Sequence, residues 1–283
     1  REELKEVERC IDSTLKSRQK LLTQTIQELN AAGGKRLRPA LVLLSGKFGR
    51  TGSDKLNPLA AIIEILHMAT LVHDDIIDDA PLRRGKPTLQ SRWGKDVAVF
   101  TGDYLFSKAF FLLTENVSFD YLQKVAMAIR KICEGEIDQY QSRYDLDVTL
   151  KKYLKRIAYK TAVLFALSCQ IGAQESGCSE KETRALRHFG MNLGMAFQIV
   201  DDILDVQGYE KVVGKPVGSD FINGIYTLPL LYALQKEQTG QELREILVRA
   251  NKAGHVFSKE DVSRVLELIH VSGGVEYSQR IVK

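Results

Sequence analysis

The sequence predicts an all-α protein, and three observations lead to that prediction. Apolar residues recur with helical periodicity through almost the whole chain. Only 6 prolines occur in 283 residues, and no run of Val, Ile and Thr alternates with polar residues as a strand would. With 44% hydrophobic residues, the chain can bury a large core. We therefore expect a single all-helical domain over residues 1–283.

In the first part of the chain, breaks in the helical pattern indicate where helices begin and end. Gly33-Gly34 ends the first helical region, and a basic loop, 35–39, leads into the next helix. Asn57 and Pro58 predict a helix start, as N-cap and first helical residue. The apolar pattern then continues to residue 78. The segment 80–87 contains two prolines and a glycine and cannot remain helical.

The second part of the chain predicts longer helices, near 90–117, 119–144, 150–172 and 180–208. Ser179 and Glu182 form a capping-box pattern before the last of these. A Gly-rich polar stretch, 208–224, comes next. Helices resume at about Tyr226, with further capping patterns at Thr239 to Glu242 and at Ser258 to Asp261.

One five-residue pattern occurs twice, as Asp74-Asp75-Ile76-Ile77-Asp78 and as Asp201-Asp202-Ile203-Leu204-Asp205. Each copy lies near the end of a predicted helix. The first and last aspartates of a helical copy share one face, with the middle aspartate beside them, so each copy makes a compact oxygen cluster. Such oxygens suit Mg²⁺. The alternative is a solvated acidic helix face, which is less consistent with two copies of one pattern.

Basic residues are also grouped, in the loop 35–39, directly after the first motif as Arg83-Arg84, and after the second motif as Lys211 and Lys215. Grouped carboxylates and grouped cations in one cavity are reconciled by a third, multiply charged component. Diphosphate fits, because Mg²⁺ ions bridge its oxygens to aspartates while Lys and Arg bind the remaining oxygens. The same arrangement stabilises diphosphate as a leaving group, since its charge grows as the C–O bond breaks.

The bulk composition argues against several other classes of protein. The net charge of +4 is modest and spread along the chain, so we expect no nucleic-acid partner. The apolar segments 158–172 and 189–206 are interrupted by polar residues, so we expect no transmembrane segment. Four cysteines lack CxxC or zinc-ligand spacing and are interpreted as reduced packing residues of a cytoplasmic protein: Cys10, Cys133, Cys169 and Cys178.

Over nearly its whole length the chain resembles the trans-isoprenyl diphosphate synthases, also called polyprenyl synthetases. The matching elements, besides the two motifs, are Gly34-Lys35-Arg36-Leu37-Arg38-Pro39, His67, Arg83-Arg84-Gly85, Gly135-Glu136 with Gln139, Lys160-Thr161, Phe197-Gln198, Gly214-Lys215, Asp220 and Thr227-Leu228-Pro229. The resemblance is to medium- and long-chain members, which make hexaprenyl, heptaprenyl or octaprenyl diphosphate. It implies antiparallel helices around a deep central cavity, with the two motifs facing across its mouth, in a protein that is usually dimeric.

The resemblance also implies a role for each matched residue. Direct Mg²⁺ ligands, for three ions with substrate bound, are Asp74, Asp78 and Asp201. Aspartates acting through water or as anchors behind those ligands are Asp75, Asp202, Asp205 and Asp220. Contacts to isopentenyl diphosphate are Lys35, Arg38, His67 and Arg84. Contacts to the allylic diphosphate are Arg83, Lys160, Gln198 and Lys215. Thr161 and Gln198 correspond to the residues that stabilise the allylic cation, so they and Lys160 are expected to be catalytic.

The implied reaction is a prenyl transfer. The allylic diphosphate ionises, the double bond of isopentenyl diphosphate attacks the cation, and a proton is lost, for which the departing diphosphate is the candidate base. One departure from the family pattern is Ile225, which stands where many relatives carry a second lysine. One cationic diphosphate contact is therefore absent, as it often is in longer-chain members.

Product length is addressed by the helix that ends in the first motif. Ala69 and Leu66 lie about one and two turns before Asp74. Short-chain members commonly carry a bulky aromatic floor in this first turn, whereas Ala69 and Thr70 are small. Each added isoprene buries five carbons, worth about 3 to 4 kcal/mol at ~0.8 kcal/mol each. We therefore expect farnesyl diphosphate as starter and a hexaprenyl to octaprenyl product for quinone side chains. Alternatively, Ala69 is a small residue at a tight helix crossing.

Three further alternatives stay open for the function. The chain could be a short-chain, geranylgeranyl-type synthase. It could be the catalytic half of a heterodimer with a non-catalytic subunit rather than a homodimer, although both aspartate motifs are intact. A terpene cyclase is less consistent with the sequence, because cyclases usually carry an Asn/Ser/Glu motif as their second metal site.

Overall fold

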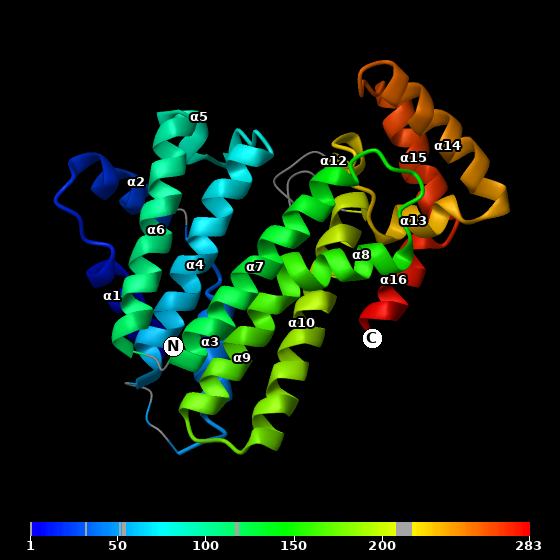
Figure 1. Ribbon diagram of the computed structural model, residues 1–283. Coiled ribbons are helices and arrows are strands. Elements are labelled where there is room, and N and C mark those ends of the chain that lie inside the picture. Colours follow the sequence, from blue (N-terminus) through cyan, green and yellow to red (C-terminus); the bar gives the residue numbers. More distant parts are fainter. Residues whose placement is uncertain (1, 32, 51, 53–54, 117–118, 208–216) are drawn as a thin grey trace. The chain divides into compact units, whose positions relative to one another are not determined.

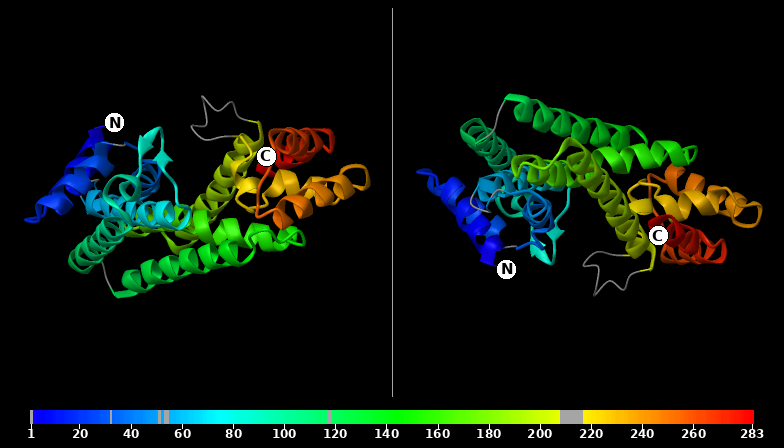
Figure 2. Two further views of the ribbon diagram at one scale, coloured as in Figure 1. Left: turned by 90° about the horizontal axis from the view of Figure 1, so that it is seen from above. Right: turned by 90° about the horizontal axis from the view of Figure 1, so that it is seen from below.

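The computed structural model describes residues 2–283 apart from 32, 51, 53–54, 117–118 and 208–216, and it confirms the all-α fold (Figure 1). Within this part of the chain, a two-residue antiparallel strand pair is the departure from helix. Strands β1 (Leu82–Arg83) and β2 (Lys86–Pro87) form it and are short cyan arrows in Figure 2. The pair lies in the segment where the sequence predicts that helix cannot continue.

The helices divide into two compact units. The first comprises residues 1–127 and 164–190, and the second comprises 128–163 and 191–283. Three helices contribute residues to both units: α7 (Phe119–Gln141), α9 (Val163–Glu175) and α10 (Glu180–Gln207). The single domain over residues 1–283 stays a prediction.

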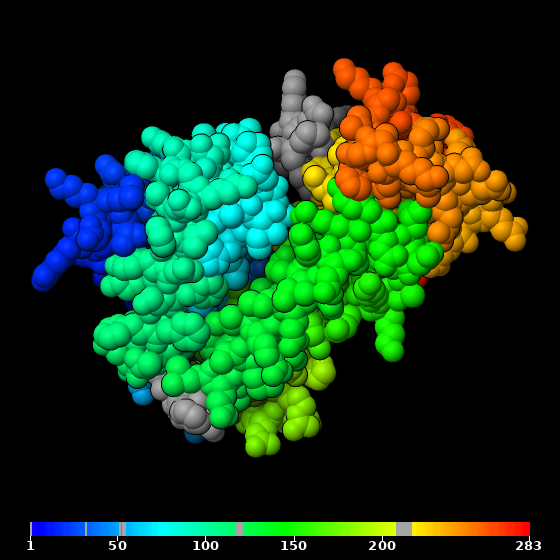
Figure 3. Space-filling model, turned by 45° about the horizontal axis from the view of Figure 1, so that its top comes forward, coloured from blue at the N-terminus to red at the C-terminus, as the bar shows by residue number. Residues whose placement is uncertain are grey.

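The first unit is built around one central helix, α4. Besides the strand pair, the helices that belong to this unit alone are α1 (Glu2–Thr14), α2 (Lys20–Ala31), α3 (Leu37–Gly46), α4 (Leu56–Ile77), α5 (Leu89–Trp93) and α6 (Lys95–Asn116). Helix α4 packs against α1, α3 and α6, and its apolar side chains are buried along most of its length. Helix α6, teal in Figure 3, reaches the surface, where its Phe100 and Phe111 side chains are exposed.

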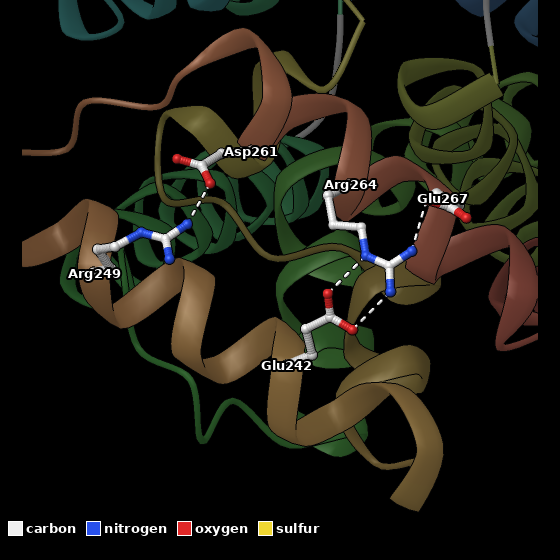
Figure 4. Close-up of polar contacts among 5 residues, drawn as sticks. All are labelled: Glu242, Arg249, Asp261, Arg264 and Glu267. Carbon is white, nitrogen blue, oxygen red and sulfur yellow. Dashed lines mark hydrogen bonds and ion pairs between the residues drawn. The ribbon is translucent and has the colours of Figure 1, made fainter.

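The second unit has its own apolar core. The elements that belong to it alone are α8 (Leu150–Ile157), η2 (Ala158–Ala162), α12 (Ser219–Ile222), α13 (Leu228–Leu234), α14 (Glu237–Lys252), α15 (Lys259–Val271) and α16 (Gly274–Val282). Helix α13 is buried and packs against α14, α15 and α16. At the surface, Arg264 of α15 donates from Nε and Nη2 to the Glu242 carboxylate at 2.6 and 2.8 Å (Figure 4). Exposed ion pairs of this kind contribute little to stability, so the apolar core provides most of the stability of this unit.

Both aspartate motifs lie near helix ends, as predicted. Helix α4 ends at Ile77, and Asp78 is its C-cap. The second motif lies in the last turns of α10, which ends at Gln207. The capping boxes at Ser179 and Ser258 are confirmed. The Ser179 hydroxyl accepts from the Glu182 N–H at 3.3 Å, and the Ser258 hydroxyl accepts from the Asp261 N–H at 3.0 Å.

Two predicted caps are wrong. Helix α4 begins at Leu56 with Lys55 as N-cap, so Asn57 is not the cap and Pro58 is the third helical residue. A proline is tolerated there because N–H groups of the first turn have no acceptor within the helix. Thr239 lies inside α14, and its hydroxyl donates to the Ala233 carbonyl at 2.8 Å instead of capping a helix.

Two predicted helices are interrupted. The helix expected near 90–117 is divided into α5 and α6 at Gly94, whose φ of 87° is accessible to glycine at little cost. The helix expected near 150–172 changes to a π-helix, η2, between α8 and α9. Neither a left-handed glycine at a helix junction nor a π-turn changes the apolar periodicity enough to be read from it.

Two described helices, α4 and α6, are long and apolar enough to span a membrane by length and composition alone. They are not the segments that the sequence analysis considered. In α4, 67% of the apolar window is buried inside the protein, against 33% in α6. A central helix that packs on several neighbours meets the same criterion, and α4 matches that description.

Candidate active site

Four arginines of the first unit surround one histidine. The loop before α3 supplies Arg36 and Arg38, and the segment after α4 supplies Arg83 and Arg84; we call these four the arginine cluster. His67 lies on α4. Burial lowers the pKa of His67 well below its ordinary value, and the charges of the arginine cluster lower it further. The imidazole is therefore neutral at pH 7 and can form hydrogen bonds without adding charge.

The arginine cluster is fixed by a buried carboxylate and by backbone. Arg36 pairs with Glu64 at 2.8 Å, and both side chains are largely buried. Arg84 donates to the carbonyl of Gly33. A Cβ on Gly34 would stand 3.3 Å from the guanidinium nitrogens of both Arg36 and Arg84, so glycine leaves room for two side chains beside the loop.

Arg38 is held differently from the others. Its guanidinium lies over the ring of Phe165, 4.6 Å from the centroid. Burial lowers the pKa of Arg38 to about 10, and the Glu64 carboxylate opposes that shift. The arginine cluster thus carries more positive charge than Glu64 neutralises, which is the condition for binding a multiply charged anion. Lys35, in the same loop, has an exposed side chain.

The first aspartate motif divides its three carboxylates between two environments. Asp74 is half-buried in the last turn of α4, and Asp78 is exposed. Asp75 is buried and accepts a 2.8 Å hydrogen bond from Arg83 Nε. Burial raises the pKa of Asp75 above its ordinary value, although Arg83 lowers it. Asp75 is therefore tied to the arginine cluster, while Asp74 and Asp78 remain accessible for a metal.

The second aspartate motif, in contrast, has one accessible and two buried carboxylates. Asp201 is exposed, whereas Asp202 and Asp205 are buried. One oxygen of Asp205 accepts from the backbone N–H of Asp220 at 3.1 Å, and its carbonyl accepts from the N–H of Gly218 at 2.7 Å. Asp205 therefore anchors the start of α12, which carries Asp220.

Asp202 lies in a network of buried polar groups. It accepts from the Tyr153 hydroxyl at 2.6 Å and from the Gln198 amide at 2.9 Å. The carbonyl of that amide accepts from the Thr161 hydroxyl at 2.7 Å. The pKa of Asp202 is raised to about 7, first by burial and then by the charge of Asp220, while the bonds from Tyr153 and Gln198 oppose the shift.

The π-helix η2 presents Lys160 and Thr161 to different partners. Lys160 pairs with Glu136 of α7 at 2.8 Å, whereas Thr161 reaches Gln198 of α10. A Cβ on Gly135 would stand 2.8 Å from the backbone nitrogen of Lys160, so α7 approaches η2 closely because residue 135 is glycine. π-Turns are rare and are frequent at functional sites.

The structure therefore brings many of the predicted residues together within each unit. In the first unit, the charge of Arg83 lowers the pKa of His67, as the charges of Arg38 and Arg84 do. From sequence, Arg83 was expected to contact the allylic diphosphate instead. In the second unit, Thr161, Gln198 and Asp202 are hydrogen-bonded. Lys215 lies outside the described residues. Ala69 and Leu66 are both fully buried on α4.

Three contributors were missed from sequence: Arg36, Glu64 and Tyr153. The signal for Glu64 was a charged residue inside an apolar helix, Tyr153 stood on the apolar face of an amphipathic helix, and Arg36 stood within the quoted loop. Among the described residues, no three His, Cys, Asp or Glu side chains are gathered so that they could hold a metal by themselves. The carboxylates that are not fully buried, those of Asp74, Asp78 and Asp201, supply oxygen ligands of the kind that Mg²⁺ takes together with substrate phosphates.

Comparisons with known proteins identify the family and the fold. The sequence pattern of a family described as polyprenyl synthetase matches residues 19–268. Heptaprenyl diphosphate synthase component 2 of Bacillus subtilis is 40% identical over 275 residues, which cover 97% of this chain and 77% of the relative. The crystal structure of heptaprenyl diphosphate synthase from Staphylococcus aureus has a TM-score of 0.93 at 34% identity, over 99% of this chain and 87% of that one.

A second solved structure is similar and contains ligands. The polyprenyl synthase from Caulobacter crescentus, complexed with calcium and isoprenyl diphosphate, has a TM-score of 0.92 at 38% identity. The match covers 99% of this chain and 84% of that chain. A divalent cation and a diphosphate are thus bound by a protein with this fold.

Proposed function

The chain belongs to the polyprenyl synthetase family, and we propose that it condenses isopentenyl diphosphate with an allylic diphosphate, farnesyl diphosphate by preference, to make a hexaprenyl to octaprenyl diphosphate. Its relatives are trans-prenyltransferases, and this chain is one as well. The proposal thus concerns the substrates, the product length and the residues that act.

One observation supports the substrate assignment most strongly: the arginine cluster around a neutral His67. The cluster has an excess of positive charge beside an aspartate motif, so a diphosphate bound there gains charge-assisted hydrogen bonds from planar guanidinium groups. Because His67 is neutral, it can orient the diphosphate through a hydrogen bond without adding a further positive charge to the site. We assign isopentenyl diphosphate to this cluster and Lys35.

The second diphosphate, that of the allylic substrate, is assigned to residues of the second unit. Lys160 supplies charge and Gln198 a polar contact, and Lys215 joins them in this proposal. Mg²⁺ ions, three with substrate bound, would be held by Asp74, Asp78 and Asp201, and would supply charge stabilisation for the leaving diphosphate. Asp75, Asp202, Asp205 and Asp220 hold the neighbouring groups in place.

The substrate assignment is tested by steady-state kinetics of Arg84→Ala and Lys35→Ala. Each variant should raise the KM for isopentenyl diphosphate about ten-fold, because a lost charge-assisted contact costs about 1.5 to 3 kcal/mol. The KM for farnesyl diphosphate should change much less. Arg92→Ala is the matched control, since Arg92 is an exposed cation paired with Glu28 on another part of the unit. Equal effects on both substrates would contradict the assignment.

Product length is tested at Ala69. The side chain is fully buried, so a phenylalanine there has to project into whatever space the growing chain uses or displace its neighbours. Ala69→Phe should shift the products toward farnesyl or geranylgeranyl diphosphate, as seen by chromatography. Ala69→Leu should shift them less. An active Ala69→Phe variant with unchanged products would mean that residue 69 only packs between helices.

A second candidate is that this chain is one component of a two-component synthase. The observation that favours it is the name of the Bacillus subtilis relative, a component 2. Purified chain incubated alone with Mg²⁺, farnesyl diphosphate and labelled isopentenyl diphosphate decides between the candidates. Turnover, together with a dimeric mass by light scattering, supports an independent homodimer, whereas a stable chain without turnover supports the two-component form.

We also propose that residues 1–283 act as one catalytic domain in the cytoplasm. The spacing of the four cysteines, which includes no CxxC pattern, supports a reducing compartment. No nucleic-acid partner is proposed.

A further inference from the structure

A continuous line of hydrogen bonds connects three elements of the second unit. Tyr153 of α8 donates to Asp202 of α10, Gln198 of α10 donates to the other oxygen of Asp202, and Thr161 of η2 donates to Gln198. The distances are 2.6, 2.9 and 2.7 Å. We call these four side chains the relay. Tyr153 is fully buried, and Asp202 is 2% exposed.

While Asp202 is ionised, the relay has a fixed direction. Both oxygens of the Asp202 carboxylate accept, one from Tyr153 and one from Gln198. A glutamine amide has a donor end and an acceptor end, and the carboxylate takes the donor end. The carbonyl of Gln198 must then face Thr161, and the Thr161 hydroxyl must give its proton to that carbonyl. The electron pairs of the Thr161 oxygen are consequently the part of that group that is left for another partner.

This direction matters for the chemistry that the proposed function requires. A cation forms on the allylic carbon, and an oxygen that presents electron pairs stabilises it, whereas one that presents a proton does not. Thr161 can act in the first way only while Gln198 accepts its proton. Gln198 keeps that orientation only while Asp202 is held as an acceptor.

Tyr153 is the residue that holds Asp202. Its ring belongs to the apolar core of the unit, a cluster that also includes Ile157 and Ile199. The core needs the ring but not the hydroxyl, so a phenylalanine would pack equally well. The hydroxyl is explained instead by its 2.6 Å hydrogen bond to the Asp202 carboxylate. Within the relay, the other bond to that carboxylate comes from Gln198. Without the Tyr153 hydroxyl, Asp202 can turn about its Cβ–Cγ bond, and the amide of Gln198 is no longer held in one orientation.

We propose that Tyr153 is a positioning residue for prenyl transfer, acting through Asp202 and Gln198 to set the direction in which the Thr161 hydroxyl points. The inference rests on the proposed function for the role of Thr161. The relay itself rests only on the contacts within the second unit.

The test is a double-mutant cycle between Tyr153→Phe and Thr161→Val, assayed in the full chain with Mg²⁺, farnesyl diphosphate and labelled isopentenyl diphosphate. Tyr153→Phe should lower kcat about ten-fold and leave the KM of each substrate within about two-fold, because Tyr153 acts through other residues. In the Thr161→Val background the same change should lower kcat less than about two-fold, since the relay no longer ends in a hydroxyl. A merely structural role would give the same factor in both backgrounds, and that result overturns the proposal.

The control is Tyr232→Phe. Tyr232 stacks on Tyr277 with ring centroids 4.3 Å apart, so the ring has a packing role in the same unit. Removal of the Tyr232 hydroxyl should leave kcat unchanged. If Tyr153→Phe is likewise without effect, the proposal is wrong.

A second readout separates this inference from the proposed function. The same cycle is measured by urea unfolding, in metal-free buffer without substrate. Coupled shifts of the unfolding midpoint for Tyr153→Phe and Thr161→Val, two residues that do not bond to each other directly, support the relay even if the parent chain transfers no prenyl group. Additive shifts contradict the relay even if the parent is a fully active synthase.

Discussion

The two aspartate motifs have nearly the same sequence but are supported in different ways. In the first motif, the buried middle aspartate, Asp75, is bonded to a cation, Arg83. In the second, the buried middle aspartate, Asp202, is bonded to two neutral groups, Tyr153 and Gln198. The first motif ends its helix, and the second lies within the last turns of a 28-residue helix.

The difference indicates how one pattern can serve two substrates. A guanidinium behind the first motif continues into the arginine cluster, so that motif is part of a charged, anion-binding surface. Neutral donors behind the second motif add no charge, and they connect the motif to the hydroxyl of Thr161. We infer that the first aspartates of the two motifs, Asp74 and Asp201, do similar work, whereas the middle aspartates, Asp75 and Asp202, do not.

The largest expected effect tests the shared part of this comparison. Asp74→Asn and Asp201→Asn should each lower kcat about 100-fold or more, because each removes a charge that is needed as the leaving diphosphate becomes more negative. The folded state should persist, as judged by circular dichroism and thermal unfolding, since both side chains are at least partly accessible. Turnover within a few-fold of the parent at saturating Mg²⁺ would show that the residue is not a metal ligand.

The next effect concerns two glycines at close helix contacts, Gly135 beside Lys160 and Gly102 beside His73. A Cβ on Gly135 would meet the backbone of Lys160 at 2.8 Å, whereas a Cβ on Gly102 of α6 would meet the His73 ring, next to the first motif, at 2.3 Å. Backbone cannot turn away, but a side chain can. Gly135→Ala should therefore destabilise the protein by about 1–3 kcal/mol, and Gly102→Ala by less. Urea unfolding measures both, and the reverse order would contradict this reasoning.

A smaller effect concerns pH and the neutral His67. The folded-state pKa of His67 is lowered, so below about pH 6.5 the unfolded chain binds a proton that the folded chain does not. Stability contributed by neutral His67 is complete above about pH 6.5 and is lost as the pH falls toward the folded-state pKa. His67→Gln should remove up to about 2 kcal/mol of the decline between about pH 6.5 and 5. Parallel stability curves for parent and variant, without substrate, would exclude this contribution.

The smallest effect is expected at Asp75. Its pKa is raised by burial despite Arg83, so the ion pair does not fully compensate for desolvation. In the Asp75→Asn variant, the amide carbonyl could still accept a hydrogen bond from Arg83, whose side chain is 38% exposed. The substitution should therefore change the free energy of unfolding by less than about 1 kcal/mol, measured by urea unfolding. A larger loss would mean that the carboxylate is needed to hold the whole arginine cluster.

Sequence patterns were sufficient for the features that depend on neighbours along the chain. The helical periodicity predicted the all-α fold, and the caps at Ser179 and Ser258 were identified because their partners are three residues away. The same local pattern failed at Thr239, where the carbonyl of Ala233 was a better partner for the hydroxyl. It also failed at Asn57, because the helix begins two residues earlier than the Asn-Pro pair suggested.

Features that depend on distant contacts were not accessible in this way. Tyr153 and Asp202 are 49 residues apart in sequence, and Arg36 and Glu64 are 28 apart. The family resemblance supplied Thr161, Gln198 and the cationic residues, because those types are quoted in its motifs. It gave no reason to single out a tyrosine on α8 or a glutamate on α4, since each acts by holding another residue.

The π-helix at residues 158–162 also bears on how this segment tolerates insertions and deletions. A π-turn holds one residue more than an α-turn, so deleting a single residue here would leave an uninterrupted α-helix with good hydrogen bonds. Because the π-turn absorbs the extra residue, the helices before and after it would keep about the same relative orientation, and the residues within the turn would change their positions. Lys160 and Thr161 could then no longer keep both Glu136 and Gln198 as partners. A one-residue deletion in this turn should therefore preserve the helix but lose the contacts of Lys160 or Thr161, so that stability and activity are affected separately.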